Sequence, residues 1–430
     1  MSTGAIGGPG ILVVGASQSG AQLVASLREM GHDGPVTLAG AERHAPYQRP
    51  PLSKKALREG LTPDLVQLRN ERFYEDRGVV LKLGCRVDRV ERGPDGSGVA
   101  WTRDGEALPF RRLALTVGAR ARHLRLPGHD LDNVVVLRSV DDATALRTRM
   151  QAAQQVVVIG GGFIGLEVAA SARLLGKDVT VVLADDQLMA RSVGALVGRH
   201  FLTAHRRSGT RVHLAARPRA FVDDGAGAVA AVELEDGREL EADLVVVGVG
   251  ASPRTELAEQ MGLVVNDGIE VDDRCLASDR WTVAAGDCAS ILSPMSGQGP
   301  ERLRFESVST AVEQAKVAAS TLLGGTATYR AVPWFWSDQG ADKLQVAGLT
   351  HGSDRLVVRG SVDEGSFAVL HYQGERLIAA ECVNRPGDFV AIRRALNAGD
   401  TIDMAGATDT TVSMKALRRR FDTTLAGMTA

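Results

Sequence analysis

The chain has 430 residues, enough for two to four domains, and its 44% hydrophobic and 24% charged residues are typical of a globular protein. The formal net charge of −2 gives no overall field that would attract nucleic acid or an anionic membrane surface. Apolar runs are too short for a membrane span or a signal sequence, and the four cysteines form no CxxC or CxxxxC pair. We therefore expect a cytoplasmic protein with no metal, no nucleic-acid partner and no membrane partner.

The first predicted element is a buried strand at 11–14, followed by a glycine turn, a helix with apolar residues at helical spacing and a second short strand. This β-α-β pattern is typical of a dinucleotide-binding domain. The turn carries Gly15 and Gly20, but Ser17 stands where the second glycine of a GxGxxG motif would lie. Glu42 follows the second strand at the distance expected of a ribose-binding carboxylate, although a solvated turn residue is the alternative.

A second and complete motif lies at 155–177, where a β-branched strand runs into Gly160–Gly165 and then into a helix. Its glycines allow backbone N–H groups to approach a pyrophosphate at the positive end of the helix. A glycine-rich turn without a ligand is the alternative. Two such units predict two doubly wound α/β domains with two nucleotide sites, which suits FAD and a nicotinamide coenzyme.

Further along the chain, apolar strands end in glycines at 112–120 and 243–250. The segment AAGDCA at 284–289 places Asp287 after another strand, where its carboxylate can be aimed at a flavin ribityl hydroxyl. Asp287 can also be the N-cap of a following helix, and both roles can hold.

Short strands with turn signals dominate after residue 325, which predicts a third, α+β domain. We expect a loosely held polar tail with a short helix at 405–430. The predicted fold is α/β, with two doubly wound Rossmann-like dinucleotide-binding domains and a C-terminal α+β domain. The predicted boundaries are 1–120 with 248–328 for a discontinuous FAD-binding domain, 121–247 for an NAD(P)H-binding domain and 329–430 for a C-terminal interface domain.

Six motifs occur in this order: PYQRPPLSK (46–54), GGGFIGLEVAA (160–170), AAGDCA (284–289), ESV (306–308), PWFWSDQ (333–339) and NRPGDF (384–389). With them the chain resembles the ferredoxin–NAD(P)+ reductase family, a branch of the glutathione-reductase-like flavoproteins that serves oxygenases. The resemblance implies an oxidoreductase with FAD and NADH as cofactors, NADPH being possible. It implies a small iron–sulfur ferredoxin as partner and, through it, an oxygenase.

The resemblance also implies roles for individual residues. Lys54 and Glu167 fall where the family has a Lys–Glu pair beside the reactive flavin N5, and Trp336 falls at the flavin edge that faces the acceptor. Without the resemblance, Lys54 is an ordinary residue at a helix start and Glu167 is a surface helix residue. The cofactor contacts expected from the motifs and the resemblance are Gly15, Ser19, Gly20, Glu42, Arg49, Lys54, Val87, Thr116, Gly118, Arg138, Gly160, Gly162, Phe163, Ile164, Gly165, Glu167, Asp185, Gly250, Asp287 and Val308.

Departures from the family pattern concern the turns and the acceptor side. Besides Ser17, the chain has TVG at 116–118 for the usual ATG and STA at 309–311 for the usual QNA. Gly340-Ala341 replaces a usual Tyr-Asp near the expected acceptor surface, so the partner can be unusual. Disulfide reductase chemistry lacks its thiols here. An NADH oxidase and a redox-sensing flavoprotein without ferredoxin turnover stay open as alternatives.

Coenzyme choice and partner docking follow from a few further residues. The usual acidic residue at the end of the second strand is replaced by Leu183, but Asp185 and Asp186 follow and would repel a 2′-phosphate, so we expect NADH to be preferred. Trp334 and Trp336 are two residues apart and should lie on the same side of a strand. A basic cluster could steer an acidic ferredoxin or form a solvated helix end, and it comprises Lys415, Arg418, Arg419 and Arg420.

Overall fold

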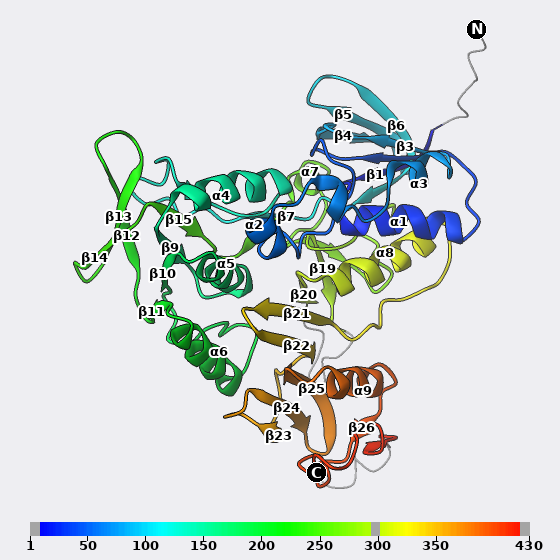
Figure 1. Cartoon of the computed structure of the whole chain (residues 1–430). Coiled ribbons are helices and arrows are strands. Elements are labelled where there is room, and N and C mark those ends of the chain that lie inside the picture. Colours follow the sequence, from blue (N-terminus) through cyan, green and yellow to red (C-terminus); the bar gives the residue numbers. More distant parts are fainter. Residues whose placement is uncertain (1–8, 294–301, 422–430) are drawn as a thin grey trace. The chain divides into compact units, whose positions relative to one another are not determined.

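The computed structural model (Figure 1) describes residues 9–293 and 302–421. These residues divide into two compact units. The first unit comes from the described parts of Met1–Pro51, Leu61–Arg120 and Ala251–Ala331. The second comes from those of Leu52–Gly60, Ala121–Gly250 and Val332–Ala430, so the second glycine turn and the C-terminal sheet share one unit. The three-domain partition expected from the sequence stays a prediction.

A seven-stranded sheet organises the first unit. β1 (Gly10–Val14) pairs in parallel with β2 (Val36–Ala39), and α1 (Gln18–Glu29) connects them, which confirms the first predicted β-α-β unit. The run Ile11–Val14 is buried throughout, as expected of a parallel strand covered on both faces. The strand order is β3 (Val79–Lys82), β2, β1, β6 (Ala107–Leu115), β5 (Gly98–Thr102) and β4 (Val87–Arg92), with β18 (Thr282–Ala284) beside β6.

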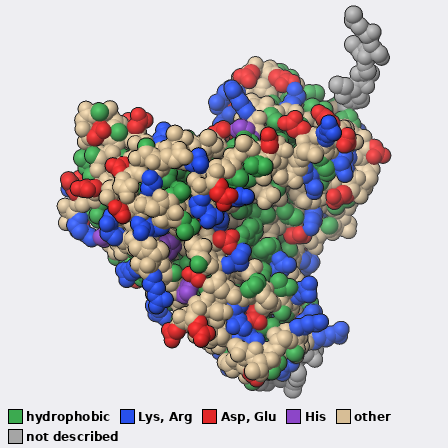
Figure 2. Space-filling view, viewed as in Figure 1, with side chains coloured by type: hydrophobic (Ala, Val, Ile, Leu, Met, Phe, Trp, Pro, Cys, Tyr) green, Lys and Arg blue, Asp and Glu red, His purple; other side chains and the backbone are tan. Residues whose placement is uncertain are grey.

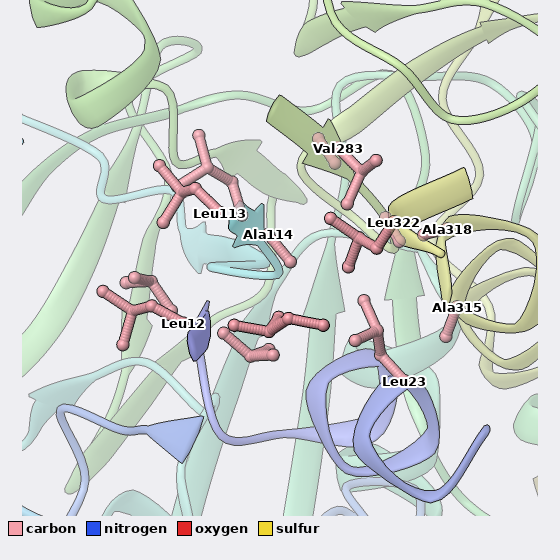
Figure 3. Packing of buried hydrophobic residues seen from close by; sticks show 14 of the residues in the cluster. Leu12, Leu23, Leu113, Ala114, Val283, Ala315, Ala318 and Leu322 are labelled. Carbon is pink, nitrogen blue, oxygen red and sulfur yellow. The ribbon is translucent and has the colours of Figure 1, made fainter. Parts of the chain in front are cut away.

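Helices α1 and α8 (Val308–Leu322) contribute to the main core of this unit. Figure 3 shows Leu23 of α1 and Ala315, Ala318 and Leu322 of α8 in one cluster with the sheet residues Leu12, Leu113, Ala114 and Val283. The small alanines of α8 permit close packing. The remaining elements of the unit are η1 (Pro63–Val66), α3 (Glu71–Glu75), α7 (Glu256–Gln260), β7 (Ala119–Ala121) with β16 (Ala251–Pro253), and a small sheet of β17 (Ile269–Val271), β19 (Ala289–Leu292) and β20 (Arg302–Leu303).

The second unit contains a five-stranded parallel sheet built around the complete glycine motif. β9 (Gln155–Ile159) pairs in parallel with β10 (Asp178–Val182), and α5 (Phe163–Leu174) connects them, which confirms the second β-α-β unit. The strand order is β11 (Arg211–His213), β10, β9, β15 (Leu244–Val247) and β8 (Val134–Val135). Beside it are α2 (Lys55–Glu59), α4 (Val140–Ala152), α6 (Ala195–Arg207) and a sheet of β12 (Pro218–Asp223), β13 (Val229–Leu234) and β14 (Glu239–Glu241).

The C-terminal part of this unit is the antiparallel sheet expected from the short strands after residue 325. Its order is β21 (Trp334–Gln339), β22 (Asp342–Gly348), β25 (Arg376–Val383), β24 (Ser366–Gln373) and β23 (Arg355–Ser361), accompanied by α9 (Pro386–Asn397). β26 (Thr401–Ile402) pairs with β27 (Arg418–Arg419). The expected tail helix is wrong for the described residues 405–421, which form turns and β27, and residues 422–430 lie outside the described part.

Acidic and basic side chains are interspersed on the face drawn in Figure 2, in keeping with the small net charge. Among the described residues, no helix combines the length and apolar character needed to cross a bilayer.

Candidate FAD, NAD(P)H and hydride-transfer sites

Three parallel strands of the first unit end at one edge of its sheet. β1 and β18 both pair with β6, and the last residue of each lies opposite Leu115. The segments that follow these strands carry Gly15, Thr116, Gly118 and Asp287, all predicted cofactor contacts. Because doubly wound folds bind ligands at the carboxyl ends of their strands, this edge is the candidate FAD site.

The first glycine turn is tightly closed against β6. Gly15 has a φ of +115°, and a Cβ there would lie 2.1 Å from the Thr116 carbonyl oxygen. The Thr116 hydroxyl donates to the Gly15 carbonyl at 2.8 Å, and a Cβ on Gly20 would lie 2.1 Å from that same carbonyl. Both glycines are therefore required by the turn itself. Ser17 is the N-cap of α1 and forms no side-chain capping bond, so its hydroxyl is not committed to closing the helix.

Glu42 is held by two neighbours from the PYQRPPLSK segment. Its carboxylate accepts hydrogen bonds from Arg49 Nη2 at 2.6 Å and from the Tyr47 hydroxyl. Burial lowers the pKa of the Arg49 guanidinium, but attraction to Tyr47, Glu42 and then Asp287 outweighs it, so the pKa is raised. A carboxylate has about four lone-pair sites, which leaves Glu42 able to accept from a ribose hydroxyl.

Asp287 lies in a turn that is held by a hydrogen bond to α8. The Gly286 amide donates to Oε1 of the fully buried Gln314 at 2.8 Å, and a Cβ on Gly286 would lie 2.2 Å from Ser19 Oγ. Strand β19 follows Asp287, so the alternative of an N-cap is wrong. Sequence reasoning missed Gln314, and its only signal was a glutamine on the apolar face of an alanine-rich helix. Of the other predicted contacts here, Val87 is buried at the start of β4 and Val308 is half-buried at the start of α8.

The second glycine turn contains two glycines that the fold requires, Gly160 and Gly165, and one that it does not require, Gly162. A Cβ on Gly160 would lie 2.3 Å from the Gly248 carbonyl oxygen, and one on Gly165 would lie 2.5 Å from the Gly160 carbonyl oxygen. Gly162 is exposed at the N-cap of α5, its backbone is extended, and a Cβ there would have no heavy atom within 4 Å. Glycine at 162 therefore leaves open space above a helix N-terminus, which fits the close approach of a pyrophosphate.

The other predicted cofactor contacts of the second unit differ in exposure and in their neighbours. Phe163 packs against Phe335 with ring centroids 4.8 Å apart, and Ile164 is 47% exposed. Asp185 is exposed just after β10, and Leu183 is buried against Gly161. Two further predicted contacts in this unit are Gly250, with a φ of +100°, and Arg138, whose amide donates to Asp142.

Lys54 and Glu167 form a buried ion pair within the second unit. Lys54 Nζ lies 2.6 Å from Glu167 Oε2, and the two side chains are 15% and 3% exposed. Lys54 is the N-cap residue of α2, and Glu167 lies on α5. The Ser53 and Ser337 hydroxyls also donate to Glu167, the latter at 2.7 Å. The alternative of a surface position for Glu167 is wrong, and the fold brings together the two residues that the resemblance paired.

The two tryptophans of PWFWSDQ lie on the same side of β21, as expected. Their rings stack with centroids 5.5 Å apart, and both side chains are partly exposed. The Arg393 guanidinium lies 4.7 Å from the centroid of Trp334. Gly340 has a φ of +64° in the two-residue turn between β21 and β22, which is a backbone reason for glycine at this departure from the family pattern.

The basic cluster near the C-terminus is partly neutralised. Arg418 pairs with Asp400 at 2.5 Å, and Arg419 pairs with Asp403. Both arginines belong to β27, so the alternative of a helix end is wrong and less free charge remains to steer a partner.

All four cysteines lie in the described residues and are free thiols. Burial raises the pKa of the Cys288 thiol to about 11, and it also raises the pKa values of Cys275 and Cys382. Burial is the main cause of the raised pKa of Cys85 as well. Thiols of this kind are poor nucleophiles, so thiol–disulfide exchange has no suitable group in this chain.

Comparison with known proteins gives consistent matches along the chain. Residues 9–315 match the family described as pyridine nucleotide-disulphide oxidoreductase, and residues 334–418 match a reductase C-terminal family. Rhodocoxin reductase from Rhodococcus erythropolis is 41% identical over 414 residues, which cover 96% of this chain and 95% of that protein.

Solved structures similar to this chain agree with the sequence matches. The ferredoxin reductase for the CYP199A2 system from Rhodopseudomonas palustris has a TM-score of 0.90 at 40% identity, covering 95% of this chain and 99% of that one. A reductase in the covalent putidaredoxin reductase–putidaredoxin complex has a TM-score of 0.89 at 33% identity, covering 95% and 98%. The fold class and the family resemblance expected from the sequence are confirmed.

Proposed function

Because the chain belongs to the pyridine nucleotide-disulphide oxidoreductase family, we propose that it is an FAD-dependent NADH:ferredoxin reductase. It passes electrons to a small iron–sulfur ferredoxin and, through it, to an oxygenase. The observation that carries the proposal is the buried Lys54–Glu167 ion pair in a chain whose cysteines are all free. The chain thus has an ammonium group, that of Lys54, suited to assist hydride transfer, and it lacks the dithiol that disulfide reductases use. The free thiols also support a cytoplasmic location.

Each group in the two units has a part in this activity. Bound FAD would supply the chemistry that links a two-electron hydride donor to a one-electron acceptor. The Gly15–Gly20 turn, Glu42 and Asp287 would hold FAD in the first unit, and the N-terminus of α5 would hold the coenzyme pyrophosphate in the second. Lys54 supplies a positive charge that favours the reduced flavin, and Glu167 keeps that ammonium in place.

The proposed exit for electrons runs past Trp336. This ring is partly exposed on β21 and stacks on Trp334, which in turn lies under Arg393, so aromatic and cationic surface is continuous there. Large aromatic residues and arginine are common at the centre of protein interfaces. A ferredoxin with acidic groups would find a complementary guanidinium at Arg393.

The test compares reduction of a ferredoxin with anaerobic reduction of FAD by NADH. Trp336→Ala should lower ferredoxin turnover at least tenfold, the usual loss for a central interface aromatic, while FAD reduction changes little. Trp101→Ala removes a tryptophan from β5 of the first unit and serves as the control. Normal ferredoxin reduction by Trp336→Ala across several candidate ferredoxins would place the exit elsewhere. Oxygen consumption faster than every ferredoxin rate would instead identify an NADH oxidase.

A further inference from the structure

Glu167 receives three hydrogen-bond donors, and only one of them is the lysine. Lys54 and Ser53 both reach Oε2, and Ser337 donates to Oε1 at 2.7 Å. Ser337 belongs to β21 and is fully buried, so the C-terminal sheet itself supplies a contact to the ion pair. A carboxylate that is 3% exposed needs such donors, because it has almost no water to replace them.

Further side chains fix the direction of the Ser337 hydroxyl. Gln339 Nε2 donates to Ser337 Oγ at 3.2 Å and to Met189 Sδ at 3.4 Å. Gln339 Oε1 lies 3.0 Å from His205 Nε2, and since an amide oxygen only accepts, that nitrogen carries the proton. Ser337 therefore accepts from Gln339 and has its own proton left for Glu167.

The network is suited to orientation rather than to proton movement. Three of its hydrogen bonds run in sequence towards the carboxylate: His205 donates to Gln339, Gln339 to Ser337, and Ser337 to Glu167. The amide of Gln339 does not take up and release protons near neutral pH, so the chain of bonds cannot act as a proton wire. Its effect is to hold Oε1 so that Oε2 is left facing Lys54.

We propose that Ser337, oriented by Gln339, is a positioning residue that fixes the Glu167 carboxylate against the Lys54 ammonium. Strand β21 thereby helps to fix the position of the Lys54 ammonium in the hydride-transfer site. Successive side chains of a strand point to opposite faces, so β21 carries Trp336 on one face and Ser337 on the other. The inference rests on the proposed function, because it takes Lys54 as the cation that acts on the flavin.

The test is Ser337→Ala in the full chain with FAD bound. Loss of one hydrogen bond to a charged group should slow anaerobic reduction of FAD by NADH by roughly ten- to a hundredfold. The half-saturating NADH concentration should stay within about twofold, because Ser337 does not belong to the turn that binds the coenzyme pyrophosphate. The midpoint potential of the bound FAD, measured by dye equilibration without NADH, should fall. Electron transfer from photoreduced FAD to ferricyanide should not change.

Two controls separate positioning from general destabilisation. Ser337→Thr keeps the hydroxyl on a residue suited to a strand and should restore both rate and potential to near the wild-type values. Ser361→Ala removes a hydroxyl from β23, where it accepts from the Glu364 amide, and should change neither. If Ser337→Ala fails to bind FAD, Gln339→Met, which cannot donate a hydrogen bond to Ser337, should lower the potential in the same direction.

The results that overturn the inference are distinct from those that overturn the proposed function. Wild-type potential and wild-type reduction rate in FAD-loaded Ser337→Ala contradict the positioning role. So does a slow Ser337→Thr, because loss of the hydroxyl would not then be the cause. A wild-type protein whose FAD is not reduced by NADH contradicts the proposed function, and the potential measurement still tests Ser337.

Discussion

Replacing Gly162 by serine isolates the nucleotide-binding role of the second glycine turn. Its backbone, with a φ of −83° and a ψ of 176°, is extended and open to any residue. A Cβ there would have no heavy atom within 4 Å, whereas one on Gly165 would lie 2.5 Å from a backbone oxygen. Gly162→Ser should therefore fold like the wild type and meet an obstacle only when NADH binds.

The expected loss of affinity follows from the position of Gly162. It caps the twelve-residue helix α5, whose first N–H groups have no partner within the helix and attract a pyrophosphate. A Cβ that keeps one N–H from a phosphate removes a hydrogen bond to a charged group, worth about 1.5–3 kcal/mol. The chain accommodates serine at the matching position of the first turn, Ser17, so we take the lower value. That corresponds to an approximately tenfold weaker affinity for NADH.

The assay is a titration of anaerobic FAD reduction with NADH in a stopped-flow instrument. Gly162→Ser should raise the half-saturating concentration roughly tenfold, with an unchanged limiting rate, FAD content and thermal midpoint. Gly387→Ser is the matched control, because Gly387 is also exposed and a Cβ there meets nothing within 4 Å. An unchanged half-saturating concentration in Gly162→Ser, or an equal rise in Gly387→Ser, would refute the assignment of this turn to the pyrophosphate.

Three other predictions concern the cofactors. NADH should give a higher kcat/KM than NADPH, because exposed Asp185 follows β10 and repels a 2′-phosphate. Asp185→Ala should narrow the difference in kcat/KM between the two coenzymes. An equal kcat/KM with NADPH in the wild type would contradict this preference. Lys54→Met should slow FAD reduction at least tenfold and lower the flavin potential, since the positive charge is lost; an unchanged stopped-flow rate would leave Lys54 a structural residue. FAD should be bound non-covalently and released on heating, and Asp287→Ala should lower its content in purified protein, measured by absorbance; full occupancy would remove Asp287 from the site.

Local patterns in the sequence account for much of the fold. Both glycine turns are followed by helices and parallel strands as predicted, because buried β-branched runs and helical spacing of apolar residues are local signals. The shared side of Trp334 and Trp336 follows from the two-residue period of a strand. Two predictions about the surroundings of a residue were wrong. Asp287 precedes a strand and not a helix, and two arginines of the basic cluster, which form a strand and not a helix end, pair with aspartates.

Some features of the candidate site likewise follow from the sequence, and others only from the tertiary structure. The sequence by itself determined the first and last glycines of each turn. A Cβ at Gly15, Gly20, Gly160 or Gly165 would lie within 2.5 Å of a backbone oxygen, so few other residues are permitted there. Lys54 and Glu167 could be paired only through the family resemblance, because 113 positions separate them and neither has a local signal. Only the tertiary structure decided that Glu167 is buried and that Ser337 and Gln339 complete its hydrogen bonds. The physical reason is that burial and donor direction depend on which distant strand covers α5, and no local spacing specifies that contact.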